Sequence, residues 1–571
     1  MTHDDHDQHL ATSGRAAPGL ADPARPDGAA PAGTGPSGLT GPRIRRLARW
    51  MLFVLAGLAL WFCYLRLSRT QAVDADGASQ ALQAWDMLHG NLLLRGWWVS
   101  DVSFYTTELP EYMLAESVRG LNADVMHVAA SLTYTLLVLF AALLARGRAT
   151  GRPAVIRMLL AAGIMLAPQL GSGTFVLLLN PDHTGSSVAM MAILLVLDRA
   201  PRRWWVVAGV GGLLAWVLVA DTVVLYTGVI PLVLVCGVRV YQEVVRRQQP
   251  AAQVRFELML AAAAAASVPV GIGAAVLIHA SGGYFAWPAG PGLVPLSGLP
   301  HNLRLGLEGI ALLFGCDFAA VHGAAGIAFA LLHVVGVVLA AWAVGVGVRR
   351  FFSETSLVTR VLTAAVLINL VGYVLSTSVL TPVNAREMAA VLPFSAVLAG
   401  RLLADRLTAA RLAHVLVPVL AVALLGYGLA LVYDAAQPPV PAQNARLTAW
   451  LGRHHYDYGL AGYWYGNGVT LTSGARVRVR PVCYGRGRFT TERWEAQTSW
   501  YDPGLHRADF LVMNPRGGYG GLHSLSDGGW ASCHPPSYRQ VVAAFGRPAH
   551  VYRVGPDKVL VWDRNLLARL G

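Results

Sequence analysis

The sequence is dominated by apolar runs of roughly 20 residues, the length that an α-helix needs to cross the hydrocarbon layer of a membrane. Hydrophobic residues make up 55% of the 571 residues and charged residues only 13%, whereas soluble proteins have about 25% charged residues. Most of the chain must therefore face lipid. This composition excludes a string of soluble domains, and five cysteines are too few for a disulfide-dense secreted scaffold.

The apolar runs predict a polytopic α-helical membrane protein with about eleven transmembrane helices. The predicted spans cover approximately residues 50–66, 124–144, 154–179, 186–198, 204–220, 223–240, 257–279, 323–346, 358–378, 387–402 and 411–433. Pro168 and Gly171 predict a break in the third span. A further candidate, 307–320, is interrupted by Asp317, and we interpret it as a re-entrant or interfacial helix.

Arginine distribution indicates how the spans are oriented. Arg43, Arg45, Arg46 and Arg49 precede the first span, and further arginines recur at alternate loops. Cytoplasmic loops concentrate Arg and Lys, so this pattern places the N-terminus in the cytoplasm and the C-terminus outside the plasma membrane. The formal net charge of +13 follows from the same asymmetry, and no nucleic-acid partner is needed to explain it.

Composition divides the chain into three parts. Residues 1–42 are rich in Pro, Gly, Ala and Asp without apolar periodicity, which predicts a disordered cytoplasmic tail. Residues 43–435 form the transmembrane domain, whose first outer loop is 67–123. Residues 436–571 contain no 20-residue apolar run and predict a small extracytoplasmic α/β domain.

Short patterns predict the elements of this C-terminal domain. A helix is expected over 446–455, and strands over 470–472, 477–480, 510–513 and 559–562. Its tyrosine-rich run, 456–465, suits either sugar stacking or an ordinary core. Cys483 and Cys533 are either a disulfide in an oxidising compartment or two buried thiols.

The first outer loop holds the most informative acidic residues. Asp74 and Asp76 are separated by Ala75 and precede an amphipathic segment, 78–91, that is expected to lie in the interface. The two carboxylates could bind Mg²⁺ or Mn²⁺, or one could take a proton from an acceptor hydroxyl while the other tunes it. The alternative is a solvated acidic loop. Glu108 and Glu111 suit either substrate binding or ordinary helix capping.

Two further polar clusters fall between apolar runs. In the first, 180–186, a helix start could receive an anion and His183 could act as acid, base or ligand, whereas Asp182 or Thr184 could simply cap the helix. In the second, Arg386 precedes a span on the outer side, where its guanidinium suits a phosphate. The alternative is an Arg386–carboxylate pair or snorkelling. Asp221 is interpreted as a wet hairpin tip.

The order of these features resembles the GT-C superfamily of integral-membrane glycosyltransferases. A first span, an outer loop opening with Asp74-Ala75-Asp76, an interfacial helix and many further spans share that arrangement, and Tyr463-Trp464 and Ser473-Gly474 resemble the outer domain of actinobacterial members. The resemblance implies that Asp74 or Asp76 is the catalytic base or a metal ligand. It also implies that Arg386 contacts a lipid phosphate, with Asp182, His183 and Glu108 as further substrate-binding candidates.

The function that this resemblance implies is inverting sugar transfer from a polyprenyl-phosphate donor to a glycan or protein acceptor of the cell envelope. The sequence identifies no certain cofactor, and it leaves open whether Mg²⁺ or Mn²⁺ is used. The competing hypothesis is a transporter, flippase or non-catalytic scaffold for lipid-linked saccharides. A transporter is expected to place its charged residues at mid-membrane.

Overall fold

The computed structural model describes residues 42–248, 250, 254–287, 292–411, 413–514, 522–524 and 530–570. The chain divides into two compact units, Met1–Val54 and Leu55–Gly571. Of the first unit, the structure describes the beginning of α1 (Pro42–Ser68). The predicted disordered tail, 1–42, lies outside the described residues apart from Pro42, where α1 starts. The second unit contains all the other elements.

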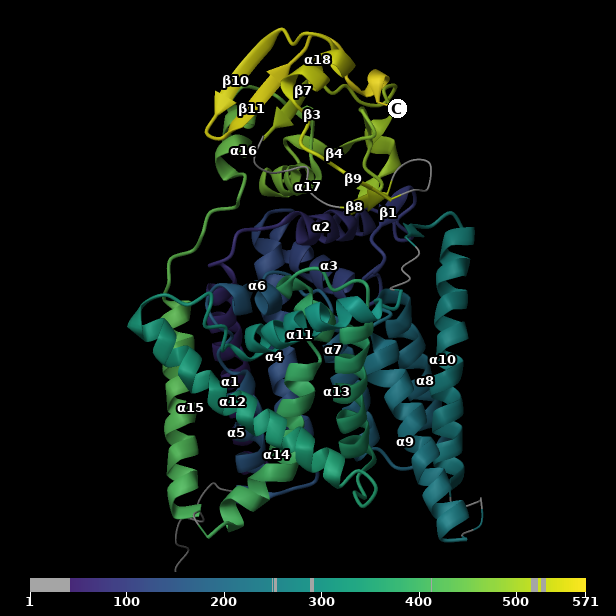
Figure 1. Ribbon diagram of the computed structural model, residues 1–571, viewed down its shortest axis with the longest axis vertical. Helices are drawn as coiled ribbons and strands as arrows, with labels where there is room; N and C mark the ends of the chain where they lie inside the picture. Colours follow the sequence, from purple (N-terminus) through teal and green to yellow (C-terminus); the bar gives the residue numbers. More distant parts are fainter. Residues whose placement is uncertain are drawn as a thin grey trace, which may run out of the picture. The chain divides into compact units, whose positions relative to one another are not determined.

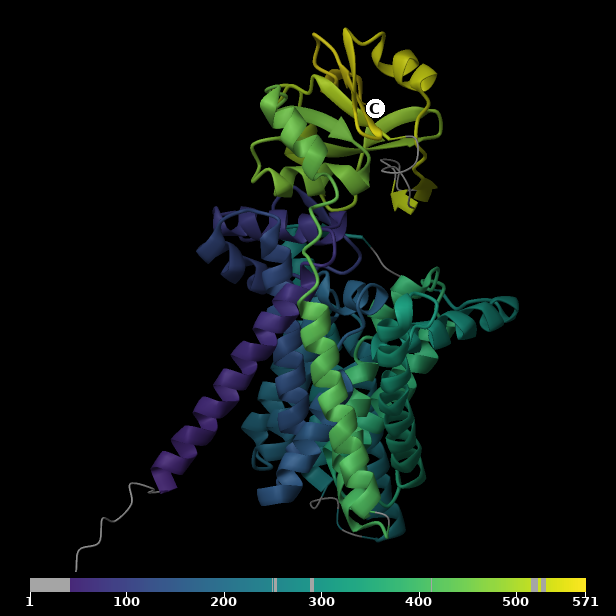
Figure 2. The ribbon, with the colours of Figure 1, turned by 90° about the vertical axis from the view of Figure 1, so that its left-hand side faces the viewer.

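The second unit is a multi-pass membrane protein whose long helices run side by side (Figure 1, Figure 2). Among the described residues, seven helices are long and apolar enough to cross a membrane, and a bent helix pair would make an eighth. These are Trp50–Ser68 of α1, α4 (Asp124–Arg146), the continuous helix Leu225–Arg246 that contains α9 (Ile230–Val240), α10 (Arg255–Ala280), α12 (Gly323–Arg349), α13 (Leu357–Leu375), α15 (Ala413–Ala435), and the pair η5 (Pro382–Met388) and α14 (Val391–Ala409).

The predicted count of about eleven is therefore too high by this measure. Three predicted spans are helices of only 15 to 17 residues, α5 (Gly151–Met165), α7 (Thr184–Arg199) and α8 (Trp204–Ala220). Only the run 154–179 includes loop residues, those between α5 and α6. The runs 186–198 and 204–220 lie within α7 and α8, which are shorter than the roughly 20 residues that a span needs.

The predicted break at Pro168 and Gly171 is confirmed. α5 ends at Met165, and a second, short helix, α6 (Ser172–Leu178), begins after Gly171, whose φ of +89° favours glycine. A helix end leaves carbonyl groups without partners, which is costly away from water. Two buried tyrosines satisfy them: Tyr134 Oη donates to Met165 O at 2.8 Å and Tyr64 Oη donates to Leu166 O at 2.9 Å.

The candidate re-entrant segment is displaced from its predicted position. The helix there, α11 (Leu299–Phe314), ends at Gly315, and Asp317 lies beyond it. Leu303 and Leu307 are exposed on α11 while Leu312 and Leu313 are buried. It does not meet the criteria of length and hydropathy for a span.

The loop 67–123 is folded rather than open. It contains α2 (Ala75–Leu88), β1 (Trp97–Val99) and α3 (Glu108–Arg119). A helix is thus present near the segment 78–91, but it begins and ends three residues earlier, at Ala75 and Leu88. Its predicted position in the membrane interface stays a prediction. β1 pairs in parallel with β2 (Phe285–Ala286) and antiparallel with β6 (Ala496–Gln497), so three distant parts of the chain share one sheet.

The C-terminal domain is a mixed α/β fold around a six-stranded sheet of order β10-β11-β7-β3-β4-β5 (Figure 1). β3 runs parallel to both β4 and β7, and the remaining pairs in this sheet are antiparallel. The strands are β3 (Tyr458–Ala461), β4 (Arg478–Gly485), β5 (Arg488–Thr491), β7 (Phe510–Met513), β10 (His550–Val554) and β11 (Asp557–Val561); a separate hairpin pairs β8 (Leu522–Ser524) with β9 (Trp530–Ser532). The helices are α16 (Ala445–Arg453), α17 (Tyr463–Thr472) and α18 (Tyr538–Phe545).

Most predicted elements of this domain are present at their predicted places, but the strand over 470–472 is wrong. Those residues end helix α17, whose two glycines give it a poor intrinsic helix propensity. Packing decides the outcome, because Leu471 is fully buried in a cluster with Ala78 and Ala81 of α2. Tertiary contacts routinely override local propensity in this way.

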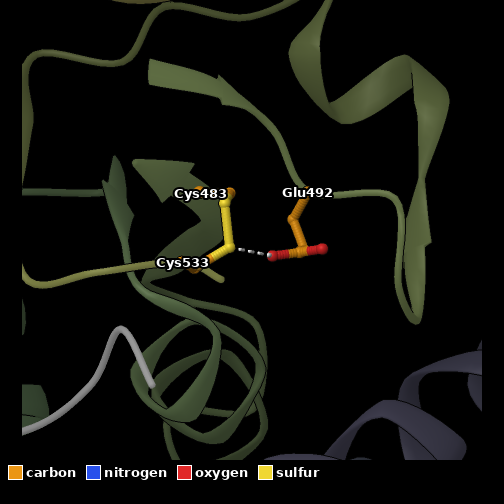
Figure 3. Close-up of side chains that lie close together, drawn as sticks. All are labelled: Cys483, Glu492 and Cys533. Atoms are coloured by element: carbon orange, nitrogen blue, oxygen red, sulfur yellow. Dashed lines mark hydrogen bonds between the residues drawn. A yellow bond between two sulfur atoms is a disulfide. The ribbon is translucent and has the colours of Figure 1, made fainter. Parts of the chain in front are cut away.

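The structure resolves the open question about two cysteines in favour of a disulfide. Cys483 on β4 is bonded to Cys533, and the carboxylate of Glu492 lies 4.0 Å from Cys533 Sγ (Figure 3). Both sulfurs are buried. The bond fastens the segment after β9 to the central sheet.

We expect the Cys483→Ser and Cys533→Ser double variant to destabilise the C-terminal domain. The bond joins positions 50 residues apart, for which the chain-entropy treatment gives about 4 kcal/mol. Proteolysis of the domain in the full-length protein measures this, with Cys63→Ser, a cysteine outside the bond, as the control. Thiol titration of the unfolded, unreduced wild type should find the three free cysteines, and five reactive thiols would contradict the assignment.

Candidate functional site

The start of α2 separates the two aspartates of the Asp74-Ala75-Asp76 motif. Asp74 is the N-cap, in extended conformation, and its Oδ1 accepts a hydrogen bond from Gly77 N at 3.0 Å. Asp76 lies one residue inside the first turn, where a carboxylate also favours the helix dipole. The motif is therefore a helix start whose two carboxylates have different surroundings.

The glycine that follows the motif allows α2 to approach its neighbours closely. A Cβ at Gly77 would lie 2.2 Å from the Met126 side chain on α4 and 3.2 Å from Asn180 Cβ. A larger residue at this position would require the Met126 side chain to move and would be tight against Asn180. Gly77 thus fixes the aspartates against the turn that contains Asn180.

A cavity of about 270 Å³ lies between α2, the turn before α7, η5 and the C-terminal domain. Four predicted site residues line it, namely Asp76, Asp182, His183 and Arg386, and Asp74 lies beside it, with its Oδ2 3.8 Å from Arg386 Nη2. The other lining residues are Gln80, Ser100, Asp101, Val102, Phe104, Val383, Asn384, Glu387, Trp494 and Glu495.

Arg386 and Asp182 form a buried ion pair in this cavity. Arg386 Nη1 donates to Asp182 Oδ2 at 3.1 Å, and Gln80 Nε2 donates to Asp182 Oδ1 at 2.5 Å. The Arg386–carboxylate alternative from the sequence is thus present in the structure. It engages only one edge of the guanidinium: Nε and Nη2 are buried and have no hydrogen-bond partner among the described residues.

His183 is held in an unusual conformation at the start of α7. It is the N-cap of that helix with φ of +57°, so neither Asp182 nor Thr184 caps α7 as the sequence alternative suggested. Its Nδ1 lies 2.9 Å from Asp221 Oδ2. Burial lowers the pKa of His183, but the charge of Asp221 and this hydrogen bond outweigh burial and raise the pKa to about 10, which makes the pair an imidazolium–carboxylate pair.

Asp221 therefore differs from its prediction. It is 1% exposed and pairs with His183, so it is not a wet hairpin tip. The sequence could not reveal this pairing, because the partner lies 38 residues earlier in the chain.

Glu108 is not brought to the cavity. It begins α3, is fully buried, and its Oε1 accepts a hydrogen bond from Ser186 N at 3.1 Å. It also accepts from the Thr107 hydroxyl. Glu108 therefore holds the first turn of α7 and is not a solvated cap. It does not line the cavity, and its predicted contact with substrate stays a prediction.

A second, smaller cavity of about 150 Å³ adjoins the first and shares Asp101, His183 and Glu387 with it. It reaches between α13 and Tyr226. Two of its lining atoms, Asn369 Oδ1 and Tyr373 Oη, are buried without a hydrogen-bond partner among the described residues. The combined space is thus lined by carboxylates, amides and hydroxyls together with apolar side chains such as Val102, Phe104 and Val223.

The C-terminal domain contributes two residues that sequence reasoning missed. Tyr463 Oη lies 2.6 Å from Asp76 Oδ1 and is also hydrogen-bonded to Glu495. The sequence marks Tyr463 as part of an aromatic run and of the resemblance to the outer domain, without a role in the site, and Glu495 follows no recognisable motif. Burial raises the pKa of Asp76 above its ordinary value, and the hydrogen bond from Tyr463 opposes this shift.

The carboxylates of the motif do not converge on a single point as metal ligands would. Among the described residues, the one group of three His, Cys, Asp or Glu ligand atoms that lie close together is Cys483, Glu492 and Cys533, two of which form the disulfide. Asp74 faces Arg386, and Asp76 is held by Tyr463. The arrangement as it stands does not fit an Mg²⁺ or Mn²⁺ site.

No protein-family model and no curated protein matches the sequence. In fold, the chain is similar to ArnT from Cupriavidus metallidurans in the apo state, with a TM-score of 0.52 and 14% identity over 92% of this chain and 99% of ArnT. A structure of the same ArnT bound to undecaprenyl phosphate gives a TM-score of 0.48 at 15% identity, covering 90% of this chain and 98% of ArnT. The Archaeoglobus fulgidus oligosaccharyltransferase complex with Zn and sulfate gives 0.46 at 13% identity, covering 81% of this chain and 68% of that one.

The similarity to apo ArnT shows that the chain shares the fold of that protein, while membership of the GT-C superfamily remains a prediction. At this low identity it shows the fold alone, and the actinobacterial subtype remains a prediction. Because one fold can host many functions, the activity has to be argued from the site.

We expect Asp74→Asn to stabilise the protein more at pH 8 than at pH 5. Burial and the neighbouring charge of Asp76 raise the pKa of Asp74 to about 7, although Arg386 opposes the shift. The pKa of this carboxyl group is about 4 in the unfolded chain and about 7 in the folded protein. The folded protein therefore loses stability as pH rises between these two values. Asparagine avoids this loss and still caps the helix.

Thermal unfolding of the full chain in detergent at the two pH values measures the effect. The increase in the free energy of unfolding caused by Asp74→Asn should be larger at pH 8 than at pH 5 by more than about 1.4 kcal/mol, the value of one pKa unit. Asp563→Asn, which removes an exposed carboxylate, serves as the control. An equal gain at both pH values would show that ionisation of Asp74 does not destabilise the fold.

Proposed function

We propose that this protein is an inverting GT-C-type glycosyltransferase that moves a sugar from a polyprenyl-phosphate donor to an acceptor hydroxyl on the outer face of the plasma membrane. One observation carries the proposal. A buried arginine with two unsatisfied donor nitrogens and an aspartate with a raised pKa line the same cavity.

Arg386 is the proposed phosphate-binding residue. Nε and Nη2 form one edge of the guanidinium, the geometry in which arginine binds two phosphate oxygens. Both nitrogens are free to donate to two ligand oxygens, and hydrogen bonds from a charged donor contribute about 1.5–3 kcal/mol each. Asp182 and Gln80 hold the opposite edge of the side chain and keep it in place.

Asp76 is the proposed general base, rather than Asp74, because it lines the cavity while Asp74 caps α2. The acceptor hydroxyl gives its proton to the Asp76 carboxylate as its oxygen forms a bond to the anomeric carbon. The bond from that carbon to the phosphate oxygen breaks with its electron pair. The products are a glycoside and a polyprenyl phosphate, whose negative charge Arg386 stabilises.

The lining of the two cavities supports a sugar as the transferred group. Carboxylates of Asp101 and Glu387 accept hydrogen bonds from hydroxyls, and Asn369 Oδ1 and Tyr373 Oη have unused hydrogen-bonding capacity. A site that leaves such atoms unpaired favours a hydroxyl-rich ligand over an apolar one.

Two features support placing the C-terminal domain outside the cell. It contains the Cys483–Cys533 disulfide, and disulfides persist in oxidising compartments. The arginine-rich loops predict the same orientation. A donor that is carried by a lipid also requires no nucleotide on that side of the membrane.

We expect Asp76→Asn to lower donor turnover by about 10²–10⁴-fold, the usual contribution of a general base. Binding of undecaprenyl phosphate should be unchanged, because the phosphate contacts Arg386. The assay measures release of undecaprenyl phosphate from a panel of undecaprenyl-phosphate-linked sugars, with total membranes as the acceptor source, in Mg²⁺ and in EDTA. Asp86→Asn, at the other end of α2, is the matched control.

Full transfer by the Asp76→Asn variant would refute the role of this residue. Cell-envelope glycans that stay unchanged when the protein is removed would instead favour the transporter or scaffold hypothesis.

We expect Arg386→Gln to weaken binding of undecaprenyl phosphate by about 10–100-fold, since charged hydrogen bonds contribute about 1.5–3 kcal/mol. Arg386→Lys keeps the charge but loses the planar pair of donors, so its affinity should be intermediate. Native mass spectrometry of the full chain with undecaprenyl phosphate measures this. Arg304→Gln, whose side chain is 77% exposed on α11, is the control, and equal affinity in all four proteins would contradict the assignment.

A further inference from the structure

The phenol of Tyr463 lies between two carboxyl groups from different parts of the molecule. Its Oη is 2.6 Å from Asp76 Oδ1 on α2 and is hydrogen-bonded to Glu495 Oε2 in the C-terminal domain. Tyr463 and Glu495 are each 3% exposed. Asp76 and Glu495 both line the 270 Å³ cavity, and Tyr463 joins them without lining it.

Counting hydrogens constrains the array. A phenol has one hydrogen to donate and oxygen lone pairs to accept with, whereas an ionised carboxylate can only accept. With Tyr463 donating to Asp76, the contact with Glu495 needs a hydrogen supplied by that carboxyl group. Either carboxyl group satisfies this count. The proposed role of Asp76 as the base requires an ionised Asp76, so the hydrogen is assigned to Glu495, which then donates to the phenol.

The surroundings of Glu495 support this hydrogen-bond direction. Burial and the nearby charge of Asp76 raise the pKa of Glu495 well above its ordinary value, and Asp182 adds to the shift. Arg386 also lines the cavity but is engaged by Asp182. Glu495 therefore faces two acidic side chains and one already paired cation.

The array is fixed from both sides of the contact. Asn467, on α17, donates through Nδ2 to Ser79 Oγ on α2 at 2.7 Å and to Glu495 O at 3.0 Å. Glu495 immediately precedes β6, which pairs with β1 of the first loop. Glu495 also has φ of +50°, a conformation that non-glycine residues adopt rarely. Helix α17 thus packs on α2 (Figure 1), and β6 pairs with β1, so both attach the C-terminal domain to the first loop.

We propose that Tyr463 and Glu495 are positioning residues through which the C-terminal domain completes the site: Glu495 orients the Tyr463 phenol, and Tyr463 orients the Asp76 carboxylate toward the cavity. This inference rests on the proposed function for the role of Asp76 as a base. The two residues act through Asp76 and make no contact with the reacting atoms. Misplacing a base by about 1 Å is enough to cost on the order of 10²-fold in rate.

The experiment compares Tyr463→Phe, Glu495→Gln and Glu495→Leu in the full-length protein, in the donor-turnover assay described above. Tyr465→Phe is the matched control, because Tyr465 lies on the same helix and its Oη bonds an aspartate, Asp557, at 3.1 Å outside the cavity. Glu495→Gln keeps an amide hydrogen that can donate to the phenol, whereas Glu495→Leu keeps none.

We expect Tyr463→Phe to lower kcat by about 10²-fold with little change in KM for the lipid donor, whose phosphate contacts Arg386. The acid limb of its pH profile should move to higher pH, because a hydrogen bond to the ionised form lowers the pKa of Asp76 and this variant lacks it. Glu495→Gln should stay close to wild type, and Glu495→Leu should approach Tyr463→Phe.

Two results would overturn the proposal. One is an unchanged acid limb in Tyr463→Phe, or a loss in Tyr465→Phe of the same size, since either would show a general structural effect. The other is equal loss in Glu495→Gln and Glu495→Leu, which would show that the acid itself is needed rather than a donor to the phenol.

Infrared difference spectroscopy separates this inference from the proposed function. It should detect the carbonyl band of a protonated carboxylic acid that disappears in Glu495→Gln and shifts in Tyr463→Phe, whatever the activity. If Asp76→Asn is fully active while this band behaves as expected, the proposed base fails and the array stands. If the band is absent from the wild type, the array fails.

Discussion

Charge buried near a membrane has to be paired, and the pairing of Arg386 with Asp182 fixes the part of this structure on which the site depends. The two residues are 204 positions apart, and their 3.1 Å contact joins η5 to the turn before α7. Gln80 extends the same network to α2. Three segments that begin or end helices are thereby held around one cavity. Removing either partner would leave a buried charge without compensation.

The broken helices explain why polar groups can gather there. Continuous helices satisfy their own backbone in lipid and offer only side chains, whereas a helix end offers N–H and C=O groups and a change of direction. The gap between α5 and α6, the His183 turn and the 55° bend between η5 and α14 are such ends. The tyrosines that donate to carbonyls near the end of α5 show how the cost of one break is offset.

Apolar periodicity predicts the long helices well, because lipid burial depends on local composition. The bounds of α8, for example, agree with its predicted run, and Pro168 and Gly171 mark a real break. The pairing of side chains is a different matter. Asp221 carries no sequence signal for His183, and Glu495 carries none for Tyr463, because each partnership exists only once distant segments have packed. Glu108 is the opposite case. Its position in the first outer loop suggested a site residue, but its carboxylate is buried and accepts a hydrogen bond from the backbone of Ser186 on α7.

The balance of charge in the cavity indicates the kind of anion that it suits. Of the two basic side chains that line it among the described residues, His183 is paired with Asp221. Arg386 Nε and Nη2 make no hydrogen bond within the described residues, although Nη2 lies 3.8 Å from Asp74 Oδ2, and these two nitrogens are the donors that face a ligand. Asp76, Asp101, Asp182 and Glu387 line the same space. Several phosphates would meet net repulsion from these acids, whereas one phosphate needs only the two donors that the guanidinium offers. A lipid monophosphate bearing a neutral, hydroxyl-rich sugar fits this balance better than a nucleotide sugar with its diphosphate.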